Sequence, residues 1–154
     1  MKKHLMCMGI SLICALVSGS VLAQEGETWD TQQTVYNVTE IKIHPNAGEQ
    51  YLNNIKRTWL SGVKAAKEEG LILDYRIFTS VTPNDGGYNL LLVTVHPNLA
   101  SMDATAELKE KGKAVEKKAQ EMIAEAEADK ITATYPEVRT ILSQKLLREI
   151  KFID

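Results

Sequence analysis

The residues best suited to bind a ligand lie on predicted strands and on one predicted helix. The candidates are Glu40, Lys42, His44, Trp59, Asp74, Arg76, His96 and Arg148. Alternate residues of a strand project to the same face, so the charged residues spaced by two within 40–44 and 74–76 fall in phase. If these faces coincide, Arg76 or Arg148 could meet an anionic ligand. The alternative is a set of salt bridges at the sheet surface, and the sequence sets neither register nor face.

Two of these candidates are histidines at strand ends. His44 and His96 are each followed by proline. A metal site needs several converging ligands, so we predict no metal and expect these rings to cap strand ends or face solvent. Trp59 falls on the apolar stripe of a predicted helix, which is typical of a core residue.

Motifs of established enzyme classes do not occur in the sequence. It contains no glycine-rich phosphate loop, no paired-histidine zinc helix and no nucleophile elbow. We therefore assign no catalytic residue and predict no cofactor.

Residues 1–23 have the three parts of a secretory signal. Two lysines precede an apolar stretch over 5–17, and Val21 and Ala23 stand where a leader peptidase accepts only small side chains. The apolar stretch is shorter than the roughly 20 residues that span a bilayer. We predict cleavage after Ala23 and a periplasmic or secreted protein that is not held by a membrane.

Cleavage would change the composition in three ways. Both cysteines, Cys7 and Cys14, leave with the leader, so neither disulfides nor thiolate chemistry is available. Of the 18 basic residues 16 remain, against 20 acidic ones, a formal charge of −4. This charge argues against nucleic acid as a partner. The remaining 131 residues suit one domain with a real core.

The first half of this mature chain predicts a strand, a helix and a hairpin. Residues 24–33 are polar and suggest a flexible lead-in, and the single domain is expected over 34–154. Strands are expected over 34–43, 71–81 and 88–96, and a helix over 47–69 that stops at Gly70. The turn-rich segment 82–87 joins the last two strands as an antiparallel hairpin.

The second half is helical and then extended. Residues 104–130 are rich in alanine, glutamate and lysine, which is typical of a helix with a narrow buried stripe and a solvated remainder. Gly112 could divide it, so one or two helices are possible. A closing strand is expected from about Lys145, with a short helix possible over 137–145.

The element order predicts the fold class. Strand, helix, strand, strand, helical region, strand is the split βαβ order, an α+β fold with a four-stranded antiparallel sheet and helices on one face. The tripeptide His-Pro-Asn ends both the first and the third predicted strand, at 44–46 and 96–98, as expected for two similar halves.

A family resemblance rests on the segments EIKIHPNAGEQYLNNIKRTW and LILDYRIF. Over 35–102 the chain resembles the dimeric α+β barrel superfamily, in particular small exported bacterial proteins of unknown activity. The resemblance implies a ferredoxin-like protomer whose open sheet face pairs with that of a second protomer. The helical insert at 99–140 departs from the compact family pattern.

The strand patterns also favour a homodimer. Leu73 and Ile77 alternate with Ile72 and Phe78, so both faces of the sheet carry apolar residues. Helices cover one face, and a second copy is the economical cover for the other.

Three functional hypotheses follow. The leading one is an exported homodimer that binds a small molecule in or near its barrel. The second, implied by the resemblance, is a small cofactor-free or haem-type monooxygenase or isomerase, which would need His44 or His96 beside Trp59 in a cavity. The third is a structural or interaction module that uses the charged helix 104–130, with an apolar patch left outside the dimer seam.

Overall fold

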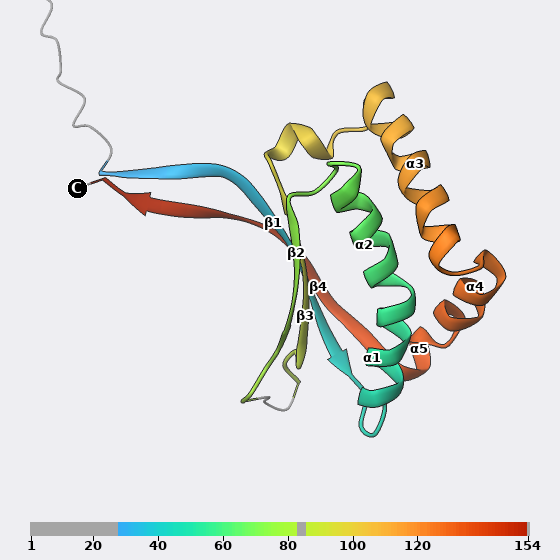
Figure 1. The fold of residues 1–154 in the computed structure, drawn as a ribbon. Coiled ribbons are helices and arrows are strands. Elements are labelled where there is room, and N and C mark those ends of the chain that lie inside the picture. The colour runs from blue at the N-terminus through green and yellow to red at the C-terminus, as the bar shows by residue number, and fades with distance from the viewer. Residues whose placement is uncertain (1–27, 83–85, 154) are drawn as a thin grey trace, which may run out of the picture.

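The computed structural model describes residues 28–82 and 86–153. The predicted leader, 1–23, and the segment 24–27 lie outside the described residues. The described chain forms one antiparallel sheet with all its helices on one face (Figure 1). The strands are β1 (Trp29–Ile43), β2 (Asp74–Thr79), β3 (Leu90–His96) and β4 (Arg139–Phe152).

The sheet has the order β2-β3-β1-β4, so β3 and β1 are central and β2 and β4 are the edges. The first strand–helix–strand unit is split by β3, and the second by β1. All three neighbouring pairs are antiparallel, which confirms the predicted ferredoxin-like α+β class and the predicted hairpin of β2 and β3.

The register assigns each strand residue to one face. Ile41 pairs with Leu90 and Thr39 with Leu92, and these partners lie under the helices. The residues between them project to the opposite face, where Val38 pairs with Val93. No helix within residues 28–82 and 86–153 lies over this second face, and we call it the open face.

The first helix is one element with an interruption. It consists of α1 (Gly48–Arg57) and α2 (Trp59–Glu68), joined at Thr58. The Thr58 side chain donates to the carbonyl of Asn54, and such a bond to the preceding turn often bends helices. The helix ends at Glu68 with Glu69 as its C-cap, and Gly70 takes a φ of 70°, the conformation expected of a glycine stop.

The remaining helical segments are the short turn η1 (Leu99–Met102), α3 (Ala106–Met122), α4 (Glu125–Ala133) and α5 (Tyr135–Val138). Among them, α3 and α4 lie outside the first helix. The charged α3 runs through Gly112 without a break and packs on α2 rather than on the sheet (Figure 1). Lys118 supports this packing through ion pairs to Glu68 and Glu69.

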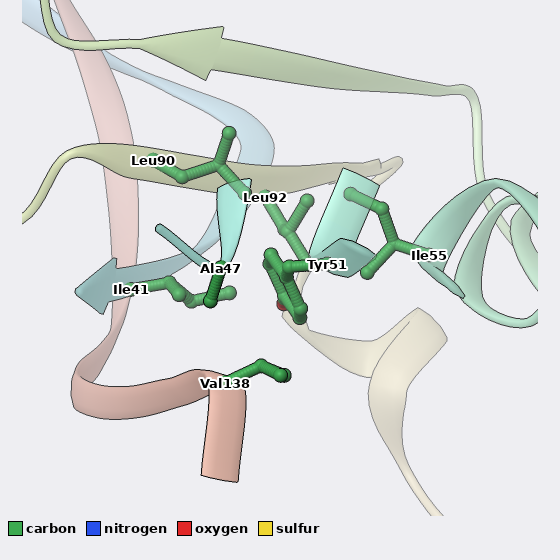
Figure 2. Packing of buried hydrophobic residues seen from close by; sticks show 7 residues of the cluster. All are labelled: Ile41, Ala47, Tyr51, Ile55, Leu90, Leu92 and Val138. Atoms are coloured by element: carbon green, nitrogen blue, oxygen red, sulfur yellow. The ribbon is translucent and has the colours of Figure 1, made fainter. Parts of the chain in front are cut away.

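The main core lies between the helix-covered face and α1. It contains Ile41, Ala47, Tyr51, Ile55, Leu90, Leu92 and Val138, and Figure 2 shows Tyr51 at its centre. Tyr51 is 1% exposed. One residue of this cluster, Val138, comes from α5, so α5 seals the end of the core.

The outer ends of β1 and β4 extend beyond the other strands as a two-stranded arm (Figure 1). Trp29 pairs with Phe152, and Thr31 with Ile150. The expectation of a flexible lead-in is therefore wrong for 29–33. These residues lack a strand pattern of their own, but 29–31 pair with β4 through the backbone regardless of side chain, and 32–33 follow where the register shifts.

The closing strand also differs from the prediction. It begins at Arg139 instead of about Lys145, and the preceding helix α5 is confined to Tyr135–Val138. A register shift beside Glu40 and Ile41 lets β4 bulge there, which interrupts the alternation in its sequence.

Candidate functional site

The open face carries a hollow of about 350 Å³. Its floor is apolar and comes from all four strands. The lining residues are Tyr36, Val38, Arg76, Phe78, Leu91, Val93, Leu147, Arg148 and Glu149. The floor valines are nearly inaccessible, whereas Phe78 and Leu147 on the two edge strands are 48% and 49% exposed. The result is a shallow apolar basin between two half-exposed side chains.

Glu40 lies on this face beside the basin. It accepts hydrogen bonds from Lys145 Nζ at 2.7 Å and from Ser143 Oγ at 2.6 Å. These bonds hold the pKa of the Glu40 carboxyl below its usual value. Glu40 is therefore an ion-paired carboxylate rather than a proton donor near neutral pH.

Asp74 and Arg76 lie on the open face of the edge strand β2. Asp74 accepts a hydrogen bond from Lys67 Nζ at 2.7 Å, and this bond is the main reason that its pKa is lowered. Arg76 Nε lies 3.7 Å from the same carboxylate, a looser contact, and its side chain is 55% exposed. The Arg76 guanidinium is thus the cation at the basin with the most freedom to meet a ligand.

Arg148 also borders the basin, but its guanidinium has a structural partner. Nε donates to the carbonyl of Gln32 at 2.7 Å and a terminal nitrogen donates to that of Thr31 at 3.1 Å. These carbonyls lie in the irregular part of β1, where the register with β4 shifts. Arg148 therefore fastens the base of the arm.

Lys42 and His44 border a different hollow, of about 610 Å³, at the end of the sheet beside α1. The His44 ring makes hydrogen bonds to the Glu137 carbonyl at 2.9 Å and to Thr140 Oγ1 at 3.0 Å. It links the end of β1 to the start of β4, which is a strand-end position of the kind expected for this histidine.

His96 and Trp59 lie on the helix side, apart from the basin. His96 Nε2 bonds Thr94 Oγ1 at 3.0 Å, and burial lowers the pKa of the imidazole. Trp59 packs edge-on against Tyr75 at 6.1 Å between ring centroids. The hollow beside Trp59 is lined by neither His44 nor His96, so the arrangement that the oxygenase hypothesis needs is not present in the described residues.

Sequence reasoning missed a second group of residues on the helix side. Tyr51, Tyr135 and Arg139 come from α1, α5 and the start of β4, and they meet beside the hollow next to Trp59. No motif joins them, because the segments that carry them are far apart in the chain. The only local signal is an arginine four residues after a tyrosine.

Exposed apolar residues also occur outside the basin. The arm carries Trp29, Ile150 and Phe152, which are 40%, 54% and 80% exposed. Their pairing places them on one side of the arm. The charged helix α3, by contrast, carries no large hydrophobic residue more exposed than Met122, and its apolar side faces α2.

Within the described ranges, no group of acidic, histidine or cysteine side chains is arranged to hold a metal ion. The same ranges contain no helix with the length and apolar character needed to cross a bilayer.

Comparison with known proteins adds little beyond the fold. No family model matches the chain, and neither does any curated protein. Among solved structures, it is similar to a dimeric protein of unknown function with a ferredoxin-like fold from Bacteroides fragilis NCTC 9343. The identity is 14% and the TM-score 0.38, over 80% of this chain and all of the other. The ferredoxin-like class therefore rests on the strand order and register themselves.

Proposed function

We propose that the protein is an exported homodimer whose two open faces enclose a small anionic ligand with an apolar body. The observation that carries the proposal is the basin itself. It combines an apolar floor, two half-exposed side chains on the edge strands, and one loosely paired arginine.

The apolar character of the basin favours a second surface that shields it from water. One face of an antiparallel sheet can face water when it is polar, but this one exposes Phe78 and Leu147 over buried valines. Burying the exposed half of Phe78 removes roughly 100 Å² from water, which favours association by about 2.5 kcal/mol per copy.

A two-fold arrangement of the edge strands would allow a second copy to provide that surface. Arg76 lies on the edge strand β2 and Glu149 on the edge strand β4. A two-fold axis parallel to the strands would bring β2 of one protomer opposite β4 of its partner. The apolar basins of the two copies would then face each other, as an isologous interface requires.

The ligand class follows from the lining. An enclosed apolar cavity with few polar groups selects an apolar body, and an arginine fork selects a carboxylate or phosphate. The symmetric cavity would present two copies of Arg76 and a combined volume of about twice the single hollow of about 350 Å³.

Export through the leader 1–23 forms part of the proposal. It is supported by the basic start, the apolar stretch and the small residues at 21 and 23. Expression of the full chain in a bacterial host, followed by mass measurement of the periplasmic protein, tests it. The expected mass is that of a chain whose first residue is Gln24. An uncleaved chain that stays in the cytoplasm would contradict export and cleavage.

Native mass spectrometry of the protein from a periplasmic extract tests the cavity. The expected result is a dimer with additional bound mass that Arg76→Gln reduces or removes. Arg57→Gln is the matched control, because Arg57 lies on α1 with a side chain 50% exposed and pairs with Glu127. A bare monomer would refute the proposal, and so would a bound mass that is equally sensitive to both variants.

A further inference from the structure

A cluster of two tyrosines and an arginine lies on the helix side, around Arg139. Its guanidinium carbon is 4.5 Å from the ring centroid of Tyr135 and 5.5 Å from that of Tyr51. Both rings are therefore within range of a cation–π contact. Tyr51 and Tyr135 also pack edge-on, with centroids 5.6 Å apart. The three side chains form a compact unit that fixes the position of the positive charge.

The charge of this unit has no protein counter-ion in the part of the chain that the structure describes. No carboxylate there forms a salt bridge with Arg139. Its Nε is inaccessible to solvent and has no hydrogen-bond partner among the residues described. Arginine carries five donors and cannot lose its proton in a protein, so a buried, unpaired N–H leaves an unmet requirement for an acceptor.

Two hollows meet at this guanidinium. One, of about 240 Å³, lies between α1, α2 and β3, and the other, of about 400 Å³, lies beside α5 and β4. Thr132, Tyr135 and Arg139 line both. The inner hollow is otherwise walled mainly by aliphatic and aromatic side chains, which are Tyr51, Ile55, Trp59 and Leu92, together with Thr58.

The polar groups near the inner hollow carry no competing negative charge. Burial raises the pKa of Tyr51 to about 12, so its phenol stays neutral at neutral pH. Thr58 Oγ1 donates to the carbonyl of Asn54 and is in hydrogen-bond contact with the Tyr135 hydroxyl. Because Thr58 gives its one proton to Asn54, the Tyr135 hydroxyl is the donor in their contact, and the guanidinium remains the charged donor for an acceptor that enters this hollow.

We propose that this unit binds a small monocarboxylate, with the carboxylate on Arg139 and an apolar ring or chain against Trp59. The inner hollow is smaller than the roughly 300–1,000 Å³ typical of drug-sized ligands, so the body fits a single ring or a short chain. The site is separate from the basin, which lies on the opposite face of the sheet.

Tryptophan fluorescence of the mature dimer or monomer can report on this site directly. The chain has two tryptophans, and Trp29→Phe leaves Trp59 alone. In that background, titration with benzoate is expected to change Trp59 emission in a saturable way. Benzamide, its neutral analogue, is expected to bind at least about tenfold more weakly, because hydrogen bonds to a charged acceptor are roughly twice as strong.

Variants separate this site from the basin. Arg139→Gln is expected to abolish the benzoate response, and Arg76→Gln, on the open face, to leave it unchanged. Circular dichroism checks that Arg139→Gln folds, and the comparison of benzoate with benzamide on unaltered Arg139 does not depend on any variant.

Three outcomes would overturn the proposal. They are no saturable response to benzoate, equal binding of benzoate and benzamide, or loss of the response in Arg76→Gln but not in Arg139→Gln. The last of these would show that benzoate binds in the basin and would support the proposed function. Loss of the response in Arg139→Gln alone would support the site at Arg139, and native mass spectrometry would then test the basin separately.

Discussion

Two neighbouring leucines on β4 provide a sharp test of whether the open face is an interface. Leu147 pairs with Tyr36 on the open face, and Leu146 pairs with Asn37 on the other face. The two are almost equally exposed, at 49% and 52%. Aspartate at position 147 would place a carboxylate in the proposed seam, and aspartate at position 146 would place the same group in solvent one residue away.

The expected magnitude follows from burial. Fully burying a leucine contributes about 1.5–3 kcal/mol, so covering the exposed half of Leu147 contributes about 1 kcal/mol, or about 2 kcal/mol for two symmetric copies. A carboxylate in the seam adds a penalty of several kcal/mol per ion. A total of at least about 4 kcal/mol would weaken the dimer about 1,000-fold.

Sedimentation equilibrium over a range of protein concentrations measures this effect. Leu147→Asp is expected to be monomeric where the parent chain is dimeric, and Leu146→Asp to keep the dissociation constant of the parent chain. The reasoning would be refuted by a parent chain that stays monomeric at every concentration, by a Leu147→Asp protein that stays dimeric, or by equal weakening in both variants. Circular dichroism of each variant controls for loss of fold.

Three further predictions concern stability and ionisation. Gly62→Ala lies inside α2 with open space around the new methyl group and is expected to raise the free energy of unfolding by about 1 kcal/mol. Gly70→Ala, at a φ of 70°, is expected to lower it by about 1–2 kcal/mol. Urea titration measures both changes. Burial lowers the pKa of His96, so the unfolded chain takes up a proton more readily than the folded one. The free energy of unfolding should therefore be highest above about pH 6.5 and fall as the pH drops through the folded-state pKa of His96. If His96→Gln leaves the slope between about pH 7 and about pH 5 unchanged, the assignment to His96 is contradicted. The NMR titration midpoint of the Glu40 carboxyl should lie below that of an ordinary glutamate and rise in Lys145→Met, whereas an unchanged midpoint would show that Lys145 is not its partner.

Much of the fold could be predicted because its signals are local. Gly70 ends the first helix since glycine, which has no Cβ, adopts a φ of 70° without steric cost. The turn segment between β2 and β3 fixes their pairing because a short connection leaves no other arrangement. The order of elements then specifies the split βαβ class. Apolar residues at both parities of the strands also indicated correctly that the open face would be apolar.

Other features depend on pairing between distant segments. Residues 29–31 have no strand pattern, yet they pair with the end of β4, because a backbone ladder needs only a partner strand with free amides and carbonyls. The same pairing gives Arg148 its structural role, since the carbonyls that it binds become available only where the register shifts.

The candidate sites divide in the same way. The sequence by itself determined that Glu40, Lys42, Asp74 and Arg76 would lie in phase along their strands, because alternation is a property of each strand alone. Tertiary structure decided that Glu40, Asp74 and Arg76 share the open face, since only the register of β1 and β2 against β3 relates them. It also brought Tyr51, Tyr135 and Arg139 together, because the packing of α1 against α5 and β4 joins segments that no local pattern connects.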